Sequence, residues 1–424
     1  MGSPGAVDTR PSAAPSTAIL RRLARTTPGV IGIVALAVGA ICVLAGVVCG
    51  GQLDGRIEER DAVLASSEPF AYAAQNLYAA LSAADAAAGS AFLSGGIETS
   101  SMRAHYQEAL ARAASALADA TAGTIDTETR TAMAKISEEL AAYTGLVESA
   151  RANNRQGYPI GSAYLREAST LMQTSLLPAA EKVYTANLAT VEDDQRAVGS
   201  LPIVSLVLLA LALVAIGVGS VIMYRRTNRQ FNIGLVVAAA TVILVIGWVV
   251  VATQLAAGEI ERSRTEGTVR FEHLAQARIL AQKARTDETL ELIARSDITA
   301  GEKWFYGHID ELKKVFDAAP AATKDAVQKW IASHQKQTEA YNAGDYDAAV
   351  AQAIGPDPAA SAAQFAAVES SLRDGIERMR ETLRARVSAA GAWLAWSPTG
   401  TLVLMVVAAS AAVVGLWPRL KEFL

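Results

Sequence analysis

The chain has 424 residues, of which 51% are hydrophobic, 19% are charged and 6% are aromatic. The charged share is below the roughly one quarter that is usual for soluble domains, and the hydrophobic residues gather in four long runs. The net charge of −4, without a basic stripe, excludes the electrostatic footprint of a nucleic-acid-binding protein. We therefore expect an integral membrane protein with the lipid bilayer, and no nucleic acid, among its partners.

The four apolar runs have the length of transmembrane helices, which need about 20 residues. They occupy residues 29–50, 201–224, 233–254 and 399–417, and none contains Asp, Glu, Lys, Arg or His. Because charged groups usually mark ion pathways in membranes, their absence argues against an ion- or proton-coupled transporter. Pairs of small residues four positions apart, such as Gly234/Ala238 and Ala411/Gly415, favour close helix contacts.

Basic residues gather before the first run, between the second and third runs, and after the fourth. They are Arg21, Arg22 and Arg25, then Arg225, Arg226 and Arg229, then Arg419 and Lys421. Short loops rich in Lys and Arg stay on the cytoplasmic side of a membrane. The sequence therefore predicts a protein of the plasma (inner) membrane, with both termini in the cytoplasm and both large domains outside it.

This topology divides the chain into nine segments. The cytoplasmic ones are a disordered tail at 1–28, a loop at 225–232 and a stub at 418–424; the extracytoplasmic ones are 51–199 and 255–397; the four apolar runs lie between them. None of the cytoplasmic segments is long enough to bury a core. We therefore expect any signal to pass to a separate cytoplasmic protein.

Both polar domains have helical sequence patterns. They are rich in Ala, their apolar residues recur every three to four positions, and glycine-containing breaks at 94–96 and 355–358 separate the helices. Four helices with short links predict an antiparallel bundle. The expected fold class is an all-α membrane protein with four transmembrane helices and two extracytoplasmic four-helix bundles.

Several matches between the two halves indicate an internal duplication. Residues 104–108 resemble residues 307–311, and residues 83–85 resemble residues 285–287. The second match ends on Asp85 in one copy and on Asp287 in the other. We interpret both aspartates as members of solvated helix faces rather than as buried partners.

The polar domains offer no motif for catalysis or for a cofactor. The four histidines, His105, His273, His308 and His334, share no metal-ligand spacing with another ligand type, and the sequence has no glycine-rich phosphate loop. We therefore expect a protein that is not an enzyme, without a cofactor or a metal site.

Two groups of residues are candidates for partner binding. The first gathers near the expected tips of the bundles and comprises Tyr158, Pro159, Trp304, Phe305, Tyr306 and Tyr346. Aromatic residues at a tip suit a docking surface, because aromatics often dominate interface energies; caps on the bundle core are an equal alternative. The second group is the cytoplasmic link with Arg225, Arg226 and Arg229, which would attract acidic groups of a partner.

Helical bundles between paired spans resemble the ligand-sensing parts of bacterial chemoreceptors and sensor kinases. The duplicated arrangement over residues 29–418, with its Ala-rich composition, resembles the GlnX-type membrane proteins of actinobacteria. The resemblance implies a link between an extracytoplasmic amino-acid-binding lipoprotein and a soluble Ser/Thr kinase, protein kinase G. We therefore expect a transmembrane signal transducer that reads a solute-binding lipoprotein and signals to a cytoplasmic kinase. The alternatives are a direct small-molecule sensor, an envelope scaffold and a transport accessory subunit. The sequence leaves open whether the protein forms a homodimer.

Overall fold

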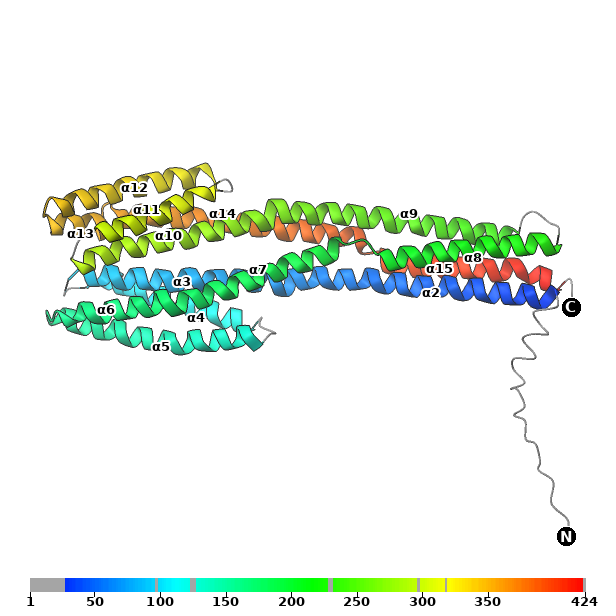
Figure 1. The fold of residues 1–424 in the computed structure, drawn as a ribbon, viewed down its shortest axis with the longest axis horizontal. Helices are drawn as coiled ribbons and strands as arrows, with labels where there is room; N and C mark the ends of the chain where they lie inside the picture. Colours follow the sequence, from blue (N-terminus) through cyan, green and yellow to red (C-terminus); the bar gives the residue numbers. More distant parts are fainter. Residues whose placement is uncertain are drawn as a thin grey trace, which may run out of the picture. The chain divides into compact units, whose positions relative to one another are not determined.

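The structure is a computed structural model that describes residues 27–95, 98–122, 127–227, 232–295, 298–316 and 319–421. Within these ranges the chain forms helices and turns without a strand, which confirms the all-α class (Figure 1). Most of the expected tail at 1–28, part of the loop at 225–232 and the end of the stub lie outside the described residues.

The described residues divide into two compact units. The apolar unit comprises the described residues of 27–58, 199–257 and 390–421, and the helical unit comprises those of 59–198 and 258–389. We call 59–198 the first segment and 258–389 the second segment of the helical unit.

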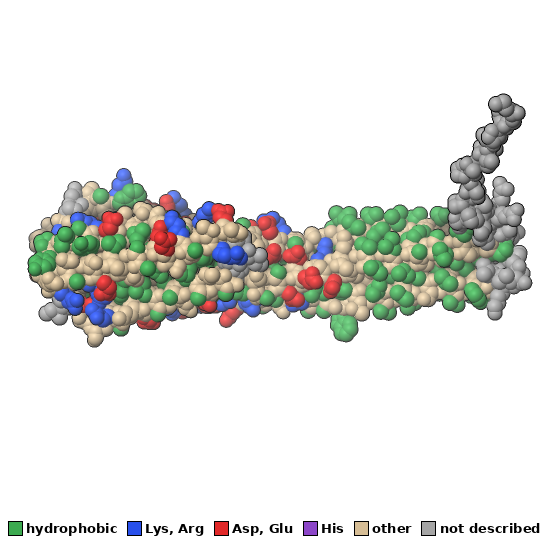
Figure 2. Space-filling model, turned by 90° about the horizontal axis from the view of Figure 1, so that it is seen from below, with side chains coloured by type: hydrophobic (Ala, Val, Ile, Leu, Met, Phe, Trp, Pro, Cys, Tyr) green, Lys and Arg blue, Asp and Glu red, His purple; other side chains and the backbone are tan. Residues whose placement is uncertain are grey.

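Four helices of the apolar unit are long and apolar enough to cross a membrane. They are α2 (Thr27–Ala62), α8 (Ile203–Thr227), α9 (Ile233–Arg262) and α15 (Ser397–Lys421). Hydrophobic side chains cover the visible face of this unit, whereas Lys, Arg, Asp and Glu gather on the helical unit (Figure 2). A lipid bilayer accommodates apolar helices, because their backbone hydrogen bonds are satisfied within the helix. The four helices therefore indicate a membrane protein.

Helices α9 and α15 approach each other closely at Gly234 and Gly415. A Cβ atom added to Gly234 would lie 2.4 Å from the carbonyl oxygen of Ala411 and 2.5 Å from the Cα atom of Gly415. The Asn232 side chain adds a hydrogen bond by donating to the Gly415 carbonyl at 3.0 Å. The two small-residue pairs that the sequence singled out therefore meet in one helix contact, as small residues at membrane helix interfaces commonly do.

The first segment of the helical unit follows the end of α2. Its elements are η1 (Val63–Ser67), α3 (Glu68–Leu93), α4 (Ser100–Ala122), α5 (Thr127–Arg155), α6 (Ile160–Leu171), η2 (Met172–Leu176) and α7 (Leu177–Gly199), where η denotes a π-helix. Helix α3 packs against α4, and α5 packs against α6.

The second segment follows the end of α9. Its elements are η3 (Ser263–Thr268), α10 (Val269–Ala294), α11 (Thr299–Lys314), α12 (Ala321–Asn342), α13 (Tyr346–Ile354) and α14 (Ser361–Leu394). Helix α13 was not expected from the sequence. Asp345 precedes it, and the Asp345 side chain caps the helix by accepting a hydrogen bond from the backbone N–H of Ala348 at 3.0 Å.

Prolines lie beside three irregularities of the long helices, namely η1, η2 and the break between α7 and α8. The π-helices η1 and η2 contain hydrogen bonds that reach back five residues, such as Glu68 N to Val63 O. Pro69 and Pro178 follow these π-helices by two residues, and neither has an N–H to donate to the helix. Pro202 lies in the break between α7 and α8, since proline disfavours a helical residue before it.

One hydrophobic core runs through both segments of the helical unit. Tyr78 and Leu81 of α3, Tyr184 of α7, and Phe271 and Leu274 of α10 belong to the same buried cluster. The rings of Tyr184 and Phe271 lie 6.5 Å apart between centroids, and α3 packs against α10. The two segments therefore share a core in this structure.

Candidate functional site

A cleft of about 1120 Å³ lies between the two segments of the helical unit. Helices α3 and α4 of the first segment line one side, and α10 and α14 of the second segment line the other. Small-molecule sites in proteins commonly enclose ~300–1,000 Å³, so the cleft is large enough for a metabolite. Its polar lining residues include Tyr72, Asn76, Arg112, Arg278, Glu369 and Arg380.

Arg278 of α10 connects three helices at the floor of this cleft. Its Nε donates to Glu369 Oε1 on α14 at 2.7 Å, and its Nη1 donates to the side-chain oxygens of Gln75 and Asn76 on α3 at 3.1 Å and 3.2 Å. Gln282 Nε2 donates to the second oxygen of Glu369 at 2.9 Å. Arg278 and Glu369 therefore form an ion pair that joins α10 to α14 in the lining of the cleft.

A second arginine group ties the two segments together at the edge of the cleft. The guanidinium of Arg380 lies 4.0 Å from the ring centroid of Tyr72, and it also pairs with Glu68. Arg384 donates to the other oxygen of Glu68 at 2.6 Å. Tyr72 in turn donates its hydroxyl hydrogen to Glu377. Residues of α14 thus hold the start of α3.

Each segment also holds a π-helix of the other. Arg384 of α14 donates to the Leu64 carbonyl of η1 at 3.0 Å. In the reverse direction, Gln195 of α7 donates to Ser263 of η3 at 3.1 Å and accepts from Thr268 at 3.0 Å. π-Helices leave backbone groups without their usual partners and occur often at functional positions. Because residues of the opposite segment bind η1 and η3, the packing of the two segments is coupled.

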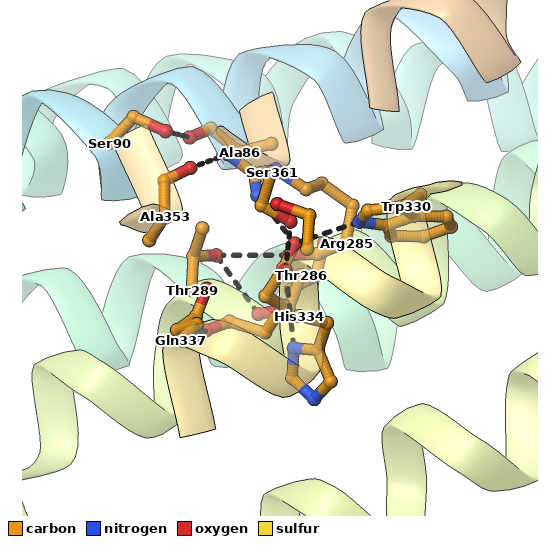
Figure 3. A network of polar contacts seen from close by, with 12 residues as sticks. Ala86, Ser90, Arg285, Thr286, Thr289, Trp330, His334, Gln337, Ala353 and Ser361 are labelled. Atoms are coloured by element: carbon orange, nitrogen blue, oxygen red, sulfur yellow. Dashed lines mark hydrogen bonds and ion pairs between the residues drawn. The ribbon is translucent and has the colours of Figure 1, made fainter. Parts of the chain in front are cut away.

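A buried polar network occupies the second segment around Glu288 of α10. Arg285, Trp330, His334 and Ser361 converge there (Figure 3). Trp330 Nε1 donates to Glu288 at 3.2 Å. Burial alone would raise the pKa of Glu288, but Arg285 and His334 outweigh it and lower that pKa to about 2.

The network continues from His334 to two further carboxylates. Nε2 of His334 lies 2.7 Å from Oε1 of Glu302, which also accepts a hydrogen bond from Thr338 at 2.8 Å. Burial raises the pKa of Glu291 to about 8. Burial disfavours the charged imidazole, but hydrogen bonds to Glu288 and Glu302 outweigh it and raise the pKa of His334 to about 9.

The first segment contains a buried carboxylate, Asp85, in a neutral environment. It accepts hydrogen bonds from Ser169 at 2.8 Å, from Gln173 at 3.2 Å and from Tyr143 at 3.3 Å. Burial raises its pKa. The expectation of a solvated helix face was therefore wrong for Asp85, because α5 and α6 cover that side of α3. Asp287 is partly exposed and pairs with His308 at 2.8 Å.

The aromatic residues that the sequence proposed for docking divide into exposed and packed ones. Trp304 is 63% exposed and Tyr158 is 56% exposed, and Pro159 is also exposed. Phe305 is fully buried and stacks on His334 with 3.7 Å between ring centroids, so it belongs to the core. Tyr306 is half-buried beside Phe305.

Tyr346 is also held within the second segment. Its hydroxyl donates to the Leu292 carbonyl at 3.0 Å, and the guanidinium of Arg295 lies 4.1 Å from its ring centroid. Of the proposed tip residues, Trp304, Tyr158 and Pro159 are exposed, Tyr306 and Tyr346 are partly exposed and Phe305 is buried; partner binding by this group stays a prediction.

The proposed cytoplasmic surface is described only in part. Arg225 is exposed near the end of α8, Arg226 belongs to the same helix, and Arg229 lies outside the described residues. Partner binding by these arginines stays a prediction.

Residues 59–196 match the family model of the actinobacterial sensor domain. The matched range coincides with the first segment of the helical unit, and it supports an actinobacterial sensor protein with a role in sensing or signalling. No curated protein and no solved structure matches the chain.

Proposed function

We propose that this chain is a non-enzymatic transmembrane signal transducer whose helical unit senses a small molecule outside the cytoplasm. The observation that carries the proposal is the polar cleft formed jointly by both segments of that unit. A ligand that binds both walls of such a cleft favours one packing of the segments over another, which is how ligands shift conformational equilibria.

The long helices offer a route from the cleft to the membrane. The helix Pro28–Leu93 contains both an apolar span and the wall residues of α3, and Ile233–Ala294 contains both a span and α10. A change in how α3 packs against α10 is therefore transmitted along helices that continue into spans.

The chemistry of the cleft favours an amino acid as the ligand. The guanidinium of Arg278 suits a carboxylate, and the carboxylate of Glu369 suits an ammonium group. This agrees with the amino-acid signal that the resemblance to GlnX-type proteins implies.

A second input is docking of a solute-binding lipoprotein. The exposure of Trp304 and Tyr158 supports this alternative, because large aromatic side chains on a surface are typical of interface hot spots. In both cases the output passes to a cytoplasmic partner, which we propose to be a Ser/Thr kinase that binds the link with Arg225, Arg226 and Arg229.

Internal duplication also belongs to this proposal. Asp85 of α3 and Glu288 of α10, one position beyond the match that pairs Asp85 with Asp287, each accept a hydrogen bond from a serine of the last long helix of their segment, Ser169 and Ser361. The π-helices η1 and η3 begin at residues 63 and 263 and interrupt corresponding long helices. These correspondences support two copies of one ancestral sensor unit.

Calorimetric titration of the full chain in detergent micelles with amino acids tests direct sensing. We expect binding of one class of amino acid, and a loss of affinity of at least about tenfold, or ~1.4 kcal/mol, in the Arg278→Gln variant. The exposed Arg166 of α6 provides the control, since Arg166→Gln removes a charge outside the cleft. Thermal unfolding of each variant verifies that it is folded.

The same preparation separates the two inputs. If the full chain binds no amino acid, but binds an amino-acid-loaded binding protein in a manner that Trp304→Ala abolishes, the lipoprotein alternative is correct and direct sensing is wrong.

A further inference from the structure

We propose that Glu291, Glu302 and His334 form a binding site for a divalent transition-metal ion in the second segment. One carboxylate oxygen from each glutamate and one ring nitrogen of His334 lie within 4.8 Å of one another. The three residues belong to α10, α11 and α12, so one ion would join three helices. This site is independent of the cleft and of its ligand.

The donor types suit zinc or a neighbouring first-row metal. Carboxylate oxygens and imidazole nitrogens both bind such ions, with metal–ligand distances of about 2.0–2.2 Å. His334 Nε2 and Glu302 Oε1 lie 2.7 Å apart in a hydrogen bond, and the two atoms would separate to about 3.3 Å when a tetrahedral ion replaces the shared proton.

The orientation of His334 is the one that a metal-bound histidine has. Its Nδ1 lies 3.2 Å from Glu288 Oε1, and Trp330 and Ser361 donate to the same carboxylate. Metal-binding histidines usually direct their second nitrogen to a carboxylate that fixes the ring. Glu288 thus holds the imidazole from behind and leaves Nε2 directed at Glu302.

An independent observation also points to a cation. Oε2 of Glu291 is buried and has no hydrogen-bond partner among the described residues, and neither has Oε1 of Gln337. Both side chains are more than nine-tenths buried, and Gln337 Nε2 donates to Glu291 Oε1 at 3.3 Å. Because a buried oxygen without a partner is costly, a bound cation gives the Glu291 carboxylate the partner it lacks.

The backbone of α11 makes room for this carboxylate. A Cβ atom added to Gly301 would lie 2.6 Å from Oε2 of Glu291. Glycine at this position therefore lets the carboxylate enter between α10 and α11, next to Glu302.

Zinc binding to the purified full chain, with any affinity tag removed, tests the proposal. After treatment with a chelator and dialysis, the chain is titrated with Zn²⁺ by calorimetry, its metal content is measured, and its thermal unfolding is followed by circular dichroism. We expect one Zn²⁺ per chain and a higher Tm in the metal-loaded form, with little competition from excess Mg²⁺, which prefers all-oxygen sites.

Glu302→Gln is the principal variant, because Glu302 is only partly buried and its replacement leaves the core intact. We expect Glu302→Gln and Glu291→Gln each to reduce zinc affinity by about tenfold or more. The exposed glutamates Glu311 on α11 and Glu339 on α12 provide matched controls, and Glu311→Gln and Glu339→Gln should bind zinc as the wild type does.

The opposite result would make the cluster a metal-free ion-pair network in which His334 bridges two carboxylates. That outcome is recognised by a zinc content well below one per chain. A zinc affinity and a zinc-induced Tm shift that are the same in Glu302→Gln as in the wild type would lead to the same conclusion.

Discussion

At the scale of single residues, the buried carboxylates Asp85 and Glu288 of the helical unit show how neighbouring charges decide protonation. Asp85 is surrounded by the neutral donors of Tyr143, Ser169 and Gln173, and burial raises its pKa. Glu288 is equally buried, but Arg285 and His334 lower its pKa. Desolvation disfavours both anions, and only the second has cations nearby to offset it.

The raised pKa of Asp85 makes stability depend on pH. Because the folded chain binds this proton more tightly than the unfolded chain, the stabilisation from the protonated form is present below the unfolded pKa and is lost as pH rises through the folded pKa. We expect Asp85→Asn, which cannot ionise, to gain stability relative to the wild type as pH rises from the ordinary pKa of aspartate towards neutral pH.

Thermal unfolding of both proteins across this range measures the effect. The exposed Asp119 of α4 provides the control, since Asp119→Asn should leave the pH dependence unchanged. A Tm difference between Asp85→Asn and the wild type that stays constant with pH would contradict the assignment.

The sequence predicted few of these site residues because their partners come from distant helices. Glu288 and Glu291 lie three positions apart on α10, and His334 and Gln337 lie three positions apart on α12. This spacing places each pair on one helix face, but no local pattern says that the two faces meet. Exposure of Trp304 beside the buried Phe305 follows helical geometry, and the sequence alone did not say which of them would face the core.

At the scale of elements, η3 is a position of close packing, because α14 of the same segment approaches it and α7 of the first segment binds it. A Cβ atom on Gly267 would lie 2.9 Å from the Cα atom of Leu383 on α14. Ser263 of η3 also donates to the Leu383 carbonyl at 3.3 Å, and Gln195 binds the same π-helix from α7. A glycine is therefore required for the approach of α14.

We predict that Gly267→Ala destabilises the helical unit by about 1–3 kcal/mol, because the added methyl group forces the backbones of η3 and α14 apart. Thermal or chemical unfolding measures the change. Gly258→Ala is the matched control on the preceding helix, where an added Cβ meets nothing within 4 Å. Equal stability of Gly267→Ala and the wild type would mean that this close approach is not maintained in solution.

At the scale of the whole molecule, the features that depend on local composition could be predicted. The all-α class and the four apolar helices follow from hydrophobic runs and helical periodicity, because a membrane admits only segments that satisfy their own backbone hydrogen bonds. The common core of the two segments could not be predicted. It depends on contacts such as Tyr184 with Phe271 and Arg380 with Glu68, which join residues that are far apart in the chain.

The central claim is that the helical unit lies outside the cytoplasm, where it can meet a ligand, and the most direct test is cysteine labelling in intact cells. In a background of Cys42→Ala and Cys49→Ala, single cysteines are introduced at the exposed positions Ser100 and Ala321 and at Thr227 near the end of α8. We predict that Ser100→Cys and Ala321→Cys react with a membrane-impermeant maleimide, whereas Thr227→Cys reacts only after permeabilisation. Labelling of Thr227→Cys in intact cells, with protection of Ser100→Cys and Ala321→Cys, would place the helical unit in the cytoplasm and contradict the account.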